Sequence, residues 1–380
     1  MAFIATQRTT TSFGKDYPQI HVTDTKIYCI WREYDGTKYQ IWTAEMNIDG
    51  TGWVATKRTT SAFSKESPQL QVTDTKIYYT WQEYDSNFFY QIWTAEINID
   101  GTGWVATQRT TSAFSKYYLQ FQVTGTKIYC IWQEYDSDNW YQIWTVEMNT
   151  DGTGWVATQR TTSTFSKNKP QLEVIGTKIY YTWGESDGTA WQIWTAEMNI
   201  DSTGWVATKR TTSAFSKEFP QLEVIGTKIY YTWEEMDGAY YQIWTAEMNI
   251  DGTGWVATKR TTSVSNNYNP QLQVASTKIY YTWNEKKGTS WQVWTAEMNI
   301  DGTGWEATQR TTSAYTKNNA QLKLGNTKIY YTWNESDSAF FYQIWTAENE
   351  IPIVKIMRCD GFYDPPIPGI KINSCDGVIH

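Results

Sequence analysis

Residues 68–111 have the sequence PQLQVTDTKIYYTWQEYDSNFFYQIWTAEINIDGTGWVATQRTT. Four short runs in it are rich in Tyr, Trp, Ile, Val and Thr and are separated by polar turns, which is typical of a meander of strands. We expect these strands over 68–72, 76–83, 90–98 and 104–111. Gly101 and Gly103, in the turn before the last run, suit the positive φ angles of a hairpin. The stretch therefore predicts one four-stranded antiparallel unit.

This unit recurs along the whole chain. The tetrapeptide Thr-Lys-Ile-Tyr begins at Thr25, Thr75, Thr126, Thr177, Thr227, Thr277 and Thr327. Self-similarity at a fixed period is the sequence signature of a repeat architecture. Seven four-stranded units fit the radial repetition of a β-propeller, which leaves only short and protected sheet edges.

The two ends of the chain indicate how the ring closes. Residues 3–10 match 53–60, so the chain begins with a lone fourth strand. Residues 343–349 form a third strand, but Glu350-Ile351-Pro352 replaces the turn that should lead to a fourth. We therefore expect an all-β, seven-bladed propeller over residues 1–350, in which strand 3–10 completes the seventh blade.

Residues 351–380 form a C-terminal extension outside the repeats. Within it, 354–361 and 370–377 are similar runs joined by a proline-rich segment, which predicts a small β-hairpin or appendage. Cys359 and Cys375 occupy corresponding positions, and a disulfide between them requires an oxidising compartment. These two thiols and the terminal His380 are too few for a structural zinc site, which takes four ligands. We expect no metal and no cofactor.

The repeat resembles the short propeller repeats of the TolB type, within the wider WD40-like superfamily. The likeness rests on Lys76-Ile77-Tyr78-Tyr79, Gln91-Ile92-Trp93, Asp100-Gly101 and Arg109-Thr110-Thr111. TolB-type repeats usually form six blades and have a serine-proline-aspartate turn before the second strand, which this sequence lacks. The resemblance therefore implies a propeller and no particular activity.

Composition restricts the partners. A net charge of −8 argues against binding to nucleic acid or anionic membranes, because both require a basic face. No apolar run is long enough to span a bilayer. Met1-Ala2-Phe3 continues directly into a predicted strand without the features of a signal peptide, so a cytoplasmic location is the default expectation and secretion stays open.

Catalytic groups are scarce. The two histidines, His21 and His380, have no partners that would form a nucleophilic triad. Glu173 and Glu223 occupy the same inner-strand position in neighbouring blades, which leaves a glycosidase as the enzyme alternative. The arginines, however, recur on the outermost strand rather than around the axis. We therefore expect a non-enzymatic protein.

The repeats differ most in two loops that strand direction places on one end of the ring. One joins the fourth strand to the next blade, and the other joins the second strand to the third. They contain aromatic residues at Tyr17, Phe88, Tyr117, Trp140, Tyr240 and Phe340. Loops on a rigid scaffold often bind ligands, although drift after duplication would produce the same variation.

We expect the ligand to be a carbohydrate, bound at several similar sites. Each blade has a second-strand Trp with a Glu two residues later, beside an inner-strand Gln, and sugars bind to an aromatic platform flanked by carboxylates and amides. The candidate residues are Trp31, Glu33, Gln69, Trp81, Glu83, Gln120, Trp132, Glu134, Gln171, Trp183, Glu185, Gln221, Trp233, Glu235, Gln271, Trp283, Glu285, Gln321, Trp333 and Glu335. Weak repeated sites would gain from avidity. The alternative is a protein-interaction scaffold on the same face.

Overall fold

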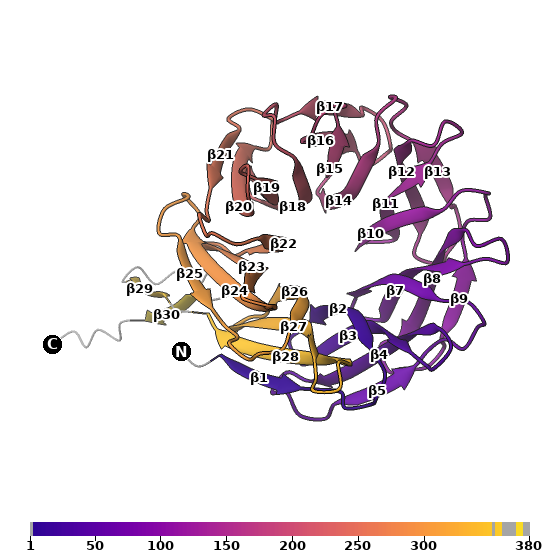
Figure 1. The fold of residues 1–380 in the computed structure, drawn as a ribbon, viewed down its shortest axis with the longest axis horizontal. Helices are drawn as coiled ribbons and strands as arrows, with labels where there is room; N and C mark the ends of the chain where they lie inside the picture. Colours follow the sequence, from indigo (N-terminus) through magenta and orange to yellow (C-terminus); the bar gives the residue numbers. More distant parts are fainter. Residues whose placement is uncertain (1–2, 352–353, 359–369, 375–380) are drawn as a thin grey trace.

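Strands account for all the regular structure in a computed structural model that describes residues 3–351, 354–358 and 370–374. Seven four-stranded antiparallel sheets surround a central axis (Figure 1). Among the described residues there is no helix of the length and apolar character needed to cross a membrane. The expected all-β, seven-bladed propeller is confirmed.

The strands of each blade follow one another from the inside of the ring outward. Blade 1 is β2 (Lys15–Val22), β3 (Lys26–Tyr34), β4 (Tyr39–Asn47) and β5 (Val54–Lys57); blade 2 is β6 (Lys65–Val72), β7 (Lys76–Tyr84), β8 (Tyr90–Asn98) and β9 (Val105–Gln108). Blade 3 is β10 (Lys116–Thr124), β11 (Lys127–Tyr135), β12 (Tyr141–Asn149) and β13 (Val156–Gln159); blade 4 is β14 (Lys167–Ile175), β15 (Lys178–Ser186), β16 (Trp191–Asn199) and β17 (Val206–Lys209). Blade 5 is β18 (Lys217–Ile225), β19 (Lys228–Met236), β20 (Tyr241–Asn249) and β21 (Val256–Lys259); blade 6 is β22 (Asn267–Val274), β23 (Lys278–Lys287), β24 (Ser290–Asn299) and β25 (Glu306–Gln309). Blade 7 is β26 (Lys317–Leu324), β27 (Lys328–Ser336), β28 (Tyr342–Glu350) and β1 (Ile4–Gln7).

The N-terminal strand closes the ring as expected. β1 pairs antiparallel with β28, with Ile4 opposite Glu348 and Gln7 opposite Trp345. The Phe3 ring lies 5.4 Å from that of Tyr331 between centroids, so the chain start packs on the last blade. The first and last repeats are thereby joined in one sheet.

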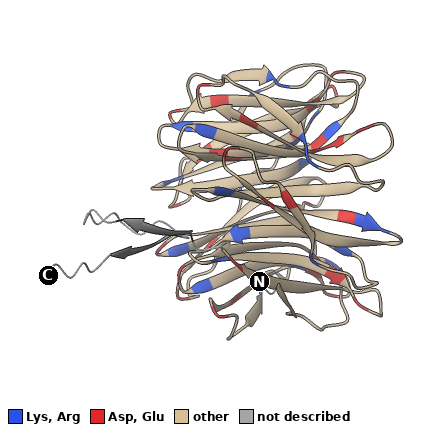
Figure 2. Cartoon of the chain, turned by 90° about the vertical axis from the view of Figure 1, so that its left-hand side faces the viewer, with Lys and Arg blue, Asp and Glu red and all other residues tan. Residues whose placement is uncertain are grey.

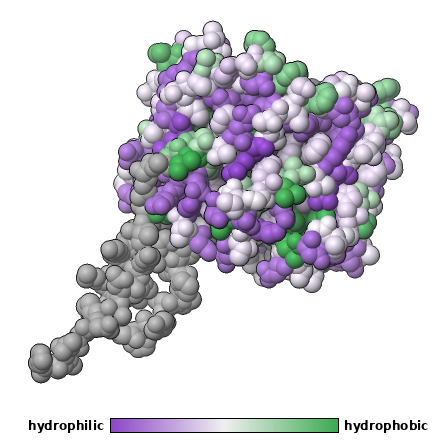
Figure 3. Space-filling model, turned by 90° about the horizontal axis from the view of Figure 1, so that it is seen from below, coloured by the Kyte–Doolittle hydropathy of each residue, from purple (hydrophilic) through white to green (hydrophobic). Residues whose placement is uncertain are grey.

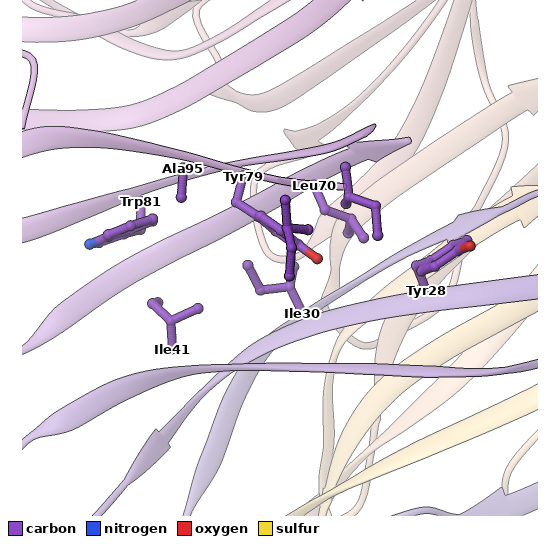
Figure 4. Packing of buried hydrophobic residues seen from close by; sticks show 9 residues of the cluster. Tyr28, Ile30, Ile41, Leu70, Tyr79, Trp81 and Ala95 are labelled. Carbon is purple, nitrogen blue, oxygen red and sulfur yellow. The ribbon is translucent and has the colours of Figure 1, made fainter. Parts of the chain in front are cut away.

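The core lies between neighbouring blades rather than inside one. In Figure 4, Trp81, Tyr79 and Leu70 of blade 2 face Ile30 and Ile41 of blade 1. Equivalent clusters recur around the ring. Large flat side chains fill the wedge between sheets efficiently, which explains the seven-fold repetition of Trp and Tyr.

The C-terminal extension differs from the expected hairpin. β29 (Val354–Arg358) and β30 (Ile370–Ser374) pair in parallel. Strands that pair in parallel are not joined by a tight hairpin turn. Cys359, Cys375 and His380 lie outside the described residues, and so does the disulfide that the two cysteines would form in an oxidising compartment.

Candidate functional site

The two variable loops of each blade lie on the same end of the ring, as expected. The Tyr34 amide donates to the carbonyl of Gly14 at 3.0 Å, and the Tyr84 amide donates to that of Ser64 at 3.3 Å. These bonds tie the second-to-third-strand loop to the loop that enters the same blade. We call this end of the ring the loop face.

The predicted Trp–Glu pairs lie inside the blades. Trp81 is 1% exposed, its Nε1 donates to Glu83 Oε2 at 3.1 Å, and the fully buried Lys65 ammonium lies 3.5 Å from Glu83 Oε1. The other six tryptophans, Trp31, Trp132, Trp183, Trp233, Trp283 and Trp333, are 0–1% exposed. The paired carboxylates Glu33, Glu134, Glu185, Glu235, Glu285 and Glu335 are buried as well. A ligand cannot reach these indole rings, because the preceding blade covers them, and we place the candidate site elsewhere.

The structure also does not bring the predicted glutamines to the tryptophans. Gln69 lies opposite Thr80 in the strand register, and successive side chains of a strand point to opposite faces, so Gln69 and Trp81 project from different sides of the sheet. The equivalent Gln120, Gln171, Gln221, Gln271 and Gln321 lie opposite the residue before the tryptophan in the same way. The predicted combination is therefore not formed.

Each inner strand has a β-bulge next to the loop face. At this bulge one residue that is not glycine has a φ between 47° and 55°, in the left-handed region that costs about 1–3 kcal/mol. These residues are Tyr17, Ser67, Tyr118, Lys169, Phe219, Asn269 and Asn319. Sequence analysis placed this segment in a loop because the bulge interrupts the alternation of apolar residues. Its backbone is constant around the ring, whereas its side chain differs between blades.

The backbone at several bulges is held by the preceding blade. The Lys169 amide donates to Gln133 Oε1 at 2.8 Å, and the Asn269 amide donates to Glu234 Oε2 at 2.7 Å. Burial raises the pKa of Glu234 to about 8, against the opposing effect of the hydrogen bond from Asn269. The rim of the loop face is thus a rigid platform that presents different side chains in each blade.

Tyrosines form a continuous arc across blades 2 and 3 on this face. Ring centroids are 3.9 Å apart for Tyr84 and Tyr90, 5.3 Å for Tyr90 and Tyr117, 5.8 Å for Tyr117 and Tyr141, and 3.9 Å for Tyr135 and Tyr141. We call these five residues the aromatic arc. Its members come from the second, third and inner strands, so no single stretch of sequence reveals it.

More exposed aromatic side chains adjoin the aromatic arc. Phe88, at the tip of a blade 2 loop, is 76% exposed and lies 6.4 Å from the Tyr84 ring between centroids. Tyr118, next to Tyr117 in the chain, and Trp140, next to Tyr141, are each 39% exposed. Phe88 therefore extends the arc into solvent, whereas Tyr90 within the arc is buried.

Arg32 anchors a charged cluster in blades 1 and 2. Its guanidinium carbon lies 4.0 Å from the Tyr39 ring centroid and 4.8 Å from that of Tyr17. The same group forms ion pairs with Asp16, at 3.3 Å, and with Glu66 of the next blade. Two carboxylates and two aromatic rings therefore surround this one cation.

A second charged cluster lies in blades 4 and 5. Lys169 Nζ is 2.7 Å from Glu218 Oε2 and 3.0 Å from the Phe219 ring centroid. Glu218 Oε1 also accepts a hydrogen bond from the Tyr241 hydroxyl at 3.2 Å. Both cations of the bulge region are thus already paired with carboxylates, which leaves no basic side chain of these clusters free for an anionic ligand.

The inner strands bring the two candidate acid–base residues close to the axis. Burial, with a further contribution from Glu223, raises the pKa of Glu173 to about 8, and burial also raises the pKa of Glu223. His21, at the same position in blade 1, has its pKa lowered to about 4 by burial and by Lys323. A protonated carboxyl group beside another carboxyl group is chemically able to donate a proton. In the described parts of the chain no arginine joins this pair and no group of potential metal ligands occurs.

Comparisons with known proteins establish the fold and not the family. No family model matches the chain, and no curated protein matches it. A PL25 ulvan lyase is similar with a TM-score of 0.65 and 10% identity, over 87% of this chain and 93% of that one. The polysaccharide lyase Uly1 has a TM-score of 0.61 and 9% identity over 87% and 88%, and the endosialidase of phage phi92 has 0.57 and 11% over 96% and 71%. The resemblance to TolB-type and WD40-like repeats therefore stays at the level of the propeller.

Proposed function

We propose that the protein binds a carbohydrate chain, without cleaving it, over the aromatic arc on the loop face. The observation that supports this most directly is the unbroken contact of five tyrosines across two blades. Tyrosine offers an apolar ring for the C–H face of a sugar and a hydroxyl for hydrogen bonds. Structural neighbours named for action on polysaccharides agree with this ligand class.

The ligand is neutral and longer than one sugar residue in this proposal. Arg32 and Lys169 are engaged by carboxylates, and the two clusters contain more acidic than basic groups, so they would repel an anionic glycan. Four successive ring separations of 3.9–5.8 Å make the arc longer than a single sugar ring. A neutral oligosaccharide fits both features.

Binding without catalysis is part of the proposal. Glu173 and Glu223 lie on the inner strands of blades 4 and 5, whereas the arc lies on blades 2 and 3. Incubation with the polysaccharide that binds should therefore produce no new reducing ends and no unsaturated sugar. Turnover that is lost in Glu173→Gln would overturn this part and favour the glycosidase alternative.

Substitution of Tyr117 tests the arc with a matched control. Blades 4 and 7 have Asn168 and Asn318 at the same position, so Tyr117→Asn keeps a side chain that the fold accepts. A neutral glycan array identifies the ligand, and calorimetry should show about tenfold weaker binding for Tyr117→Asn. Tyr268→Asn, the same change outside the arc, should leave affinity unchanged. Background signal on the array, or equal losses in both variants, would contradict the proposal.

A protein partner is the second candidate, because two loop tips on this face are strongly apolar. Phe88 is 76% exposed and Phe340 is 88% exposed. Exposed aromatic side chains at loop tips are typical of protein contacts. Affinity capture with the wild-type chain and with the double variant Phe88→Ser/Phe340→Ser distinguishes a protein-interaction scaffold from a carbohydrate site. A protein retained only by the wild type supports the scaffold. Glycan binding that the double variant keeps supports the aromatic arc.

A further inference from the structure

Clefts open between neighbouring blades near the end of the ring opposite the loop face. The cleft between blades 4 and 5 has a volume of about 300 Å³ and is lined by polar groups of Tyr180, Glu197, Arg210 and Asp251. A smaller one between blades 2 and 3, about 70 Å³, is lined by the corresponding Tyr78, Glu96, Arg109 and Asp151. The same four types of polar side chain therefore line both clefts.

An arginine in a fixed orientation lines each of these clefts. Arg210 Nε donates to Thr195 Oγ1 at 2.8 Å and Nη1 donates to the Gly252 carbonyl at 3.1 Å. Its guanidinium carbon lies 5.8 Å from the Trp255 ring centroid. No hydrogen bond within the described chain uses Nη2 of Arg210 or the hydroxyl of Tyr180. Nη2 of Arg210 is therefore free to bind a ligand, and the hydroxyl of Tyr180, a side chain that is 4% exposed, is the second unpaired group.

The cleft between blades 4 and 5 is balanced in charge and apolar on part of its lining. Glu197 pairs with Lys178 at 3.2 Å, and Asp251 Oδ1 accepts hydrogen bonds from its own turn at Thr253. The remaining lining includes Met248 and Ile250. A neutral ligand with several hydroxyls and a small apolar group matches this combination better than an ion does.

We propose that the cleft between blades 4 and 5 is a site for a single neutral sugar residue that has a methyl-bearing substituent, such as an acetamido group or a deoxy carbon. Arg210 and Tyr180 would hydrogen-bond the ring hydroxyls, while the methyl group would contact Met248 and Ile250. The volume of this cleft lies at the lower end of small-molecule sites, about 300–1,000 Å³, whereas the cleft between blades 2 and 3 is smaller and has Thr150 in the place of Ile250. This site is distinct from the aromatic arc and does not depend on the function proposed for it.

The arginine and its threonine partner recur in all seven blades. In each, the arginine Nε donates to a third-strand threonine at 2.7–2.8 Å. The arginines are Arg8, Arg58, Arg109, Arg160, Arg210, Arg260 and Arg310. The fixed arginine is therefore a general feature of the blade, and the larger volume distinguishes the cleft between blades 4 and 5 from the one between blades 2 and 3.

A methionine methyl group allows ligand binding in the cleft between blades 4 and 5 to be observed directly. Met248 lines the cleft between blades 4 and 5, whereas Met236 ends β19 at the loop face. In the full chain labelled at methionine methyls, titration with N-acetyl-D-glucosamine or L-fucose should shift the Met248 resonance and leave Met236 unchanged. D-glucose, which lacks a methyl group, should bind at least about fivefold more weakly.

A variant pair on one strand tests whether the shift arises in the cleft. Val206 lines it and is 56% exposed, so Val206→Trp should fill the entrance without disturbing the core. Ala207→Trp places the same side chain on the other face of the strand and is the control. The proposal requires the Met248 shift to disappear in Val206→Trp only.

Three results would overturn the inference. These are no shift of Met248 with either methyl-bearing sugar at millimolar concentrations, a shift that survives Val206→Trp, and an equal response to D-glucose. None of them affects the Tyr117→Asn comparison, because Tyr117 is not part of any cleft lining. Failure here and failure of the aromatic arc are therefore distinguishable.

Discussion

Lys65, the first residue of β6, is buried although it is charged, because its ammonium group is hydrogen-bonded and lies next to a carboxylate. Lys65 is 0% exposed, and its Nζ donates to the Phe63 carbonyl at 2.5 Å and to the Ser61 hydroxyl. Burial lowers the pKa of Lys65, while Glu83 opposes that shift. In blade 6 the lysine is replaced by Asn267, whose Oδ1 accepts the Trp283 indole hydrogen at 3.0 Å. Either a lysine or an asparagine can therefore occupy this buried position in the blade.

Removal of this lysine should be costly because Glu83 is left buried without its cation. We expect Lys65→Ala to lower the free energy of unfolding by about 3–5 kcal/mol, the loss typical of a broken buried ion pair. Lys65→Ala/Glu83→Gln should recover part of it, since the remaining group is then neutral. Urea denaturation of both variants measures this, and a double variant no better than the single would contradict the ion-pair explanation.

The buried carboxyl groups of the inner strands, Glu173 and Glu223, should make the free energy of unfolding depend on pH. Because the pKa of Glu173 rises from 4.5 to about 8 on folding, the folded state binds more protons than the unfolded chain between these values. The free energy of unfolding therefore falls as pH rises through that window. Glu173→Gln should show a shallower decline of Tm between pH 5 and pH 8 by calorimetry.

The control for this measurement is Glu306→Gln. Glu306 is exposed on the outer strand β25, where five blades have valine and blade 7 has Ile4, so its loss should leave the pH dependence as in the wild type. Parallel pH profiles of the wild type and Glu173→Gln would show that burial does not perturb this carboxyl group.

At the scale of the strand, one position of the second strand bonds to the following blade at several boundaries. Asn284 Nδ2 donates to the Lys317 carbonyl at 3.1 Å, and Asn334 Nδ2 donates to the Lys15 carbonyl at 3.2 Å. Blade 4 has Gly184 at this position, where an added Cβ would lie 3.7 Å from the Lys217 carbonyl in ordinary contact. The boundary between blades 4 and 5 therefore lacks the bond that the asparagines of blades 6 and 7 make.

Gly184→Asn should restore that bond. Blade 6 shows that an asparagine fits here beside a tryptophan, since Trp291 occupies the position of Trp191. We expect a gain of about 1–2 kcal/mol, from one buried hydrogen bond and from the smaller entropy of the unfolded chain without glycine. Calorimetry should show a higher Tm, whereas Gly184→Ala, which adds no amide, should gain less. A lower Tm for Gly184→Asn would show that the space is not available.

For the whole molecule, stability depends on closing the ring. Arg8 follows β1 and bonds to Thr346 of blade 7 and to the Gly50 carbonyl of blade 1, so the N-terminal segment joins both ends of the repeat array. Acidic and basic residues alternate along the strands and loops of the ring in Figure 2 and do not segregate to one part of it. On the side seen in Figure 3, hydrophobic residues form separate small patches. The surfaces shown would therefore not drive association while the ring is closed.

Deletion of residues 1–10 should make the molecules prone to associate. It leaves β28 with an unpaired edge rich in Trp, Ile and Tyr, which is a template for pairing between molecules. We expect aggregation or a large fall in Tm, by size-exclusion chromatography and thermal melts. Deletion of residues 353–380 should have a much smaller effect because the strands of the ring end at Glu350. A monomeric N-terminal deletion with unchanged Tm would mean that β1 is dispensable.

The repeats were sufficient to predict the propeller, its blade number and its closure. Each strand of the repeat occurs seven times in nearly the same sequence, and residues 3–10 match a fourth strand without ambiguity. The same comparison located the loop face, because positions that the blade does not constrain vary between units. Local sequence holds this information since strand and turn propensities act over a few residues.

Only the tertiary structure decided which aromatic side chains a ligand can reach. β7 is buried along nearly its whole length on both faces, so its sequence has no alternation that would separate covered residues such as Trp81 from accessible ones. The aromatic arc and the Arg32 cluster are built by side chains from neighbouring blades: Tyr90 and Tyr117 are 27 residues apart in the chain, and Arg32 and Glu66 are 34 residues apart. Burial between two sheets depends on how closely the sheets approach, and that distance is a property of the closed ring rather than of any one repeat.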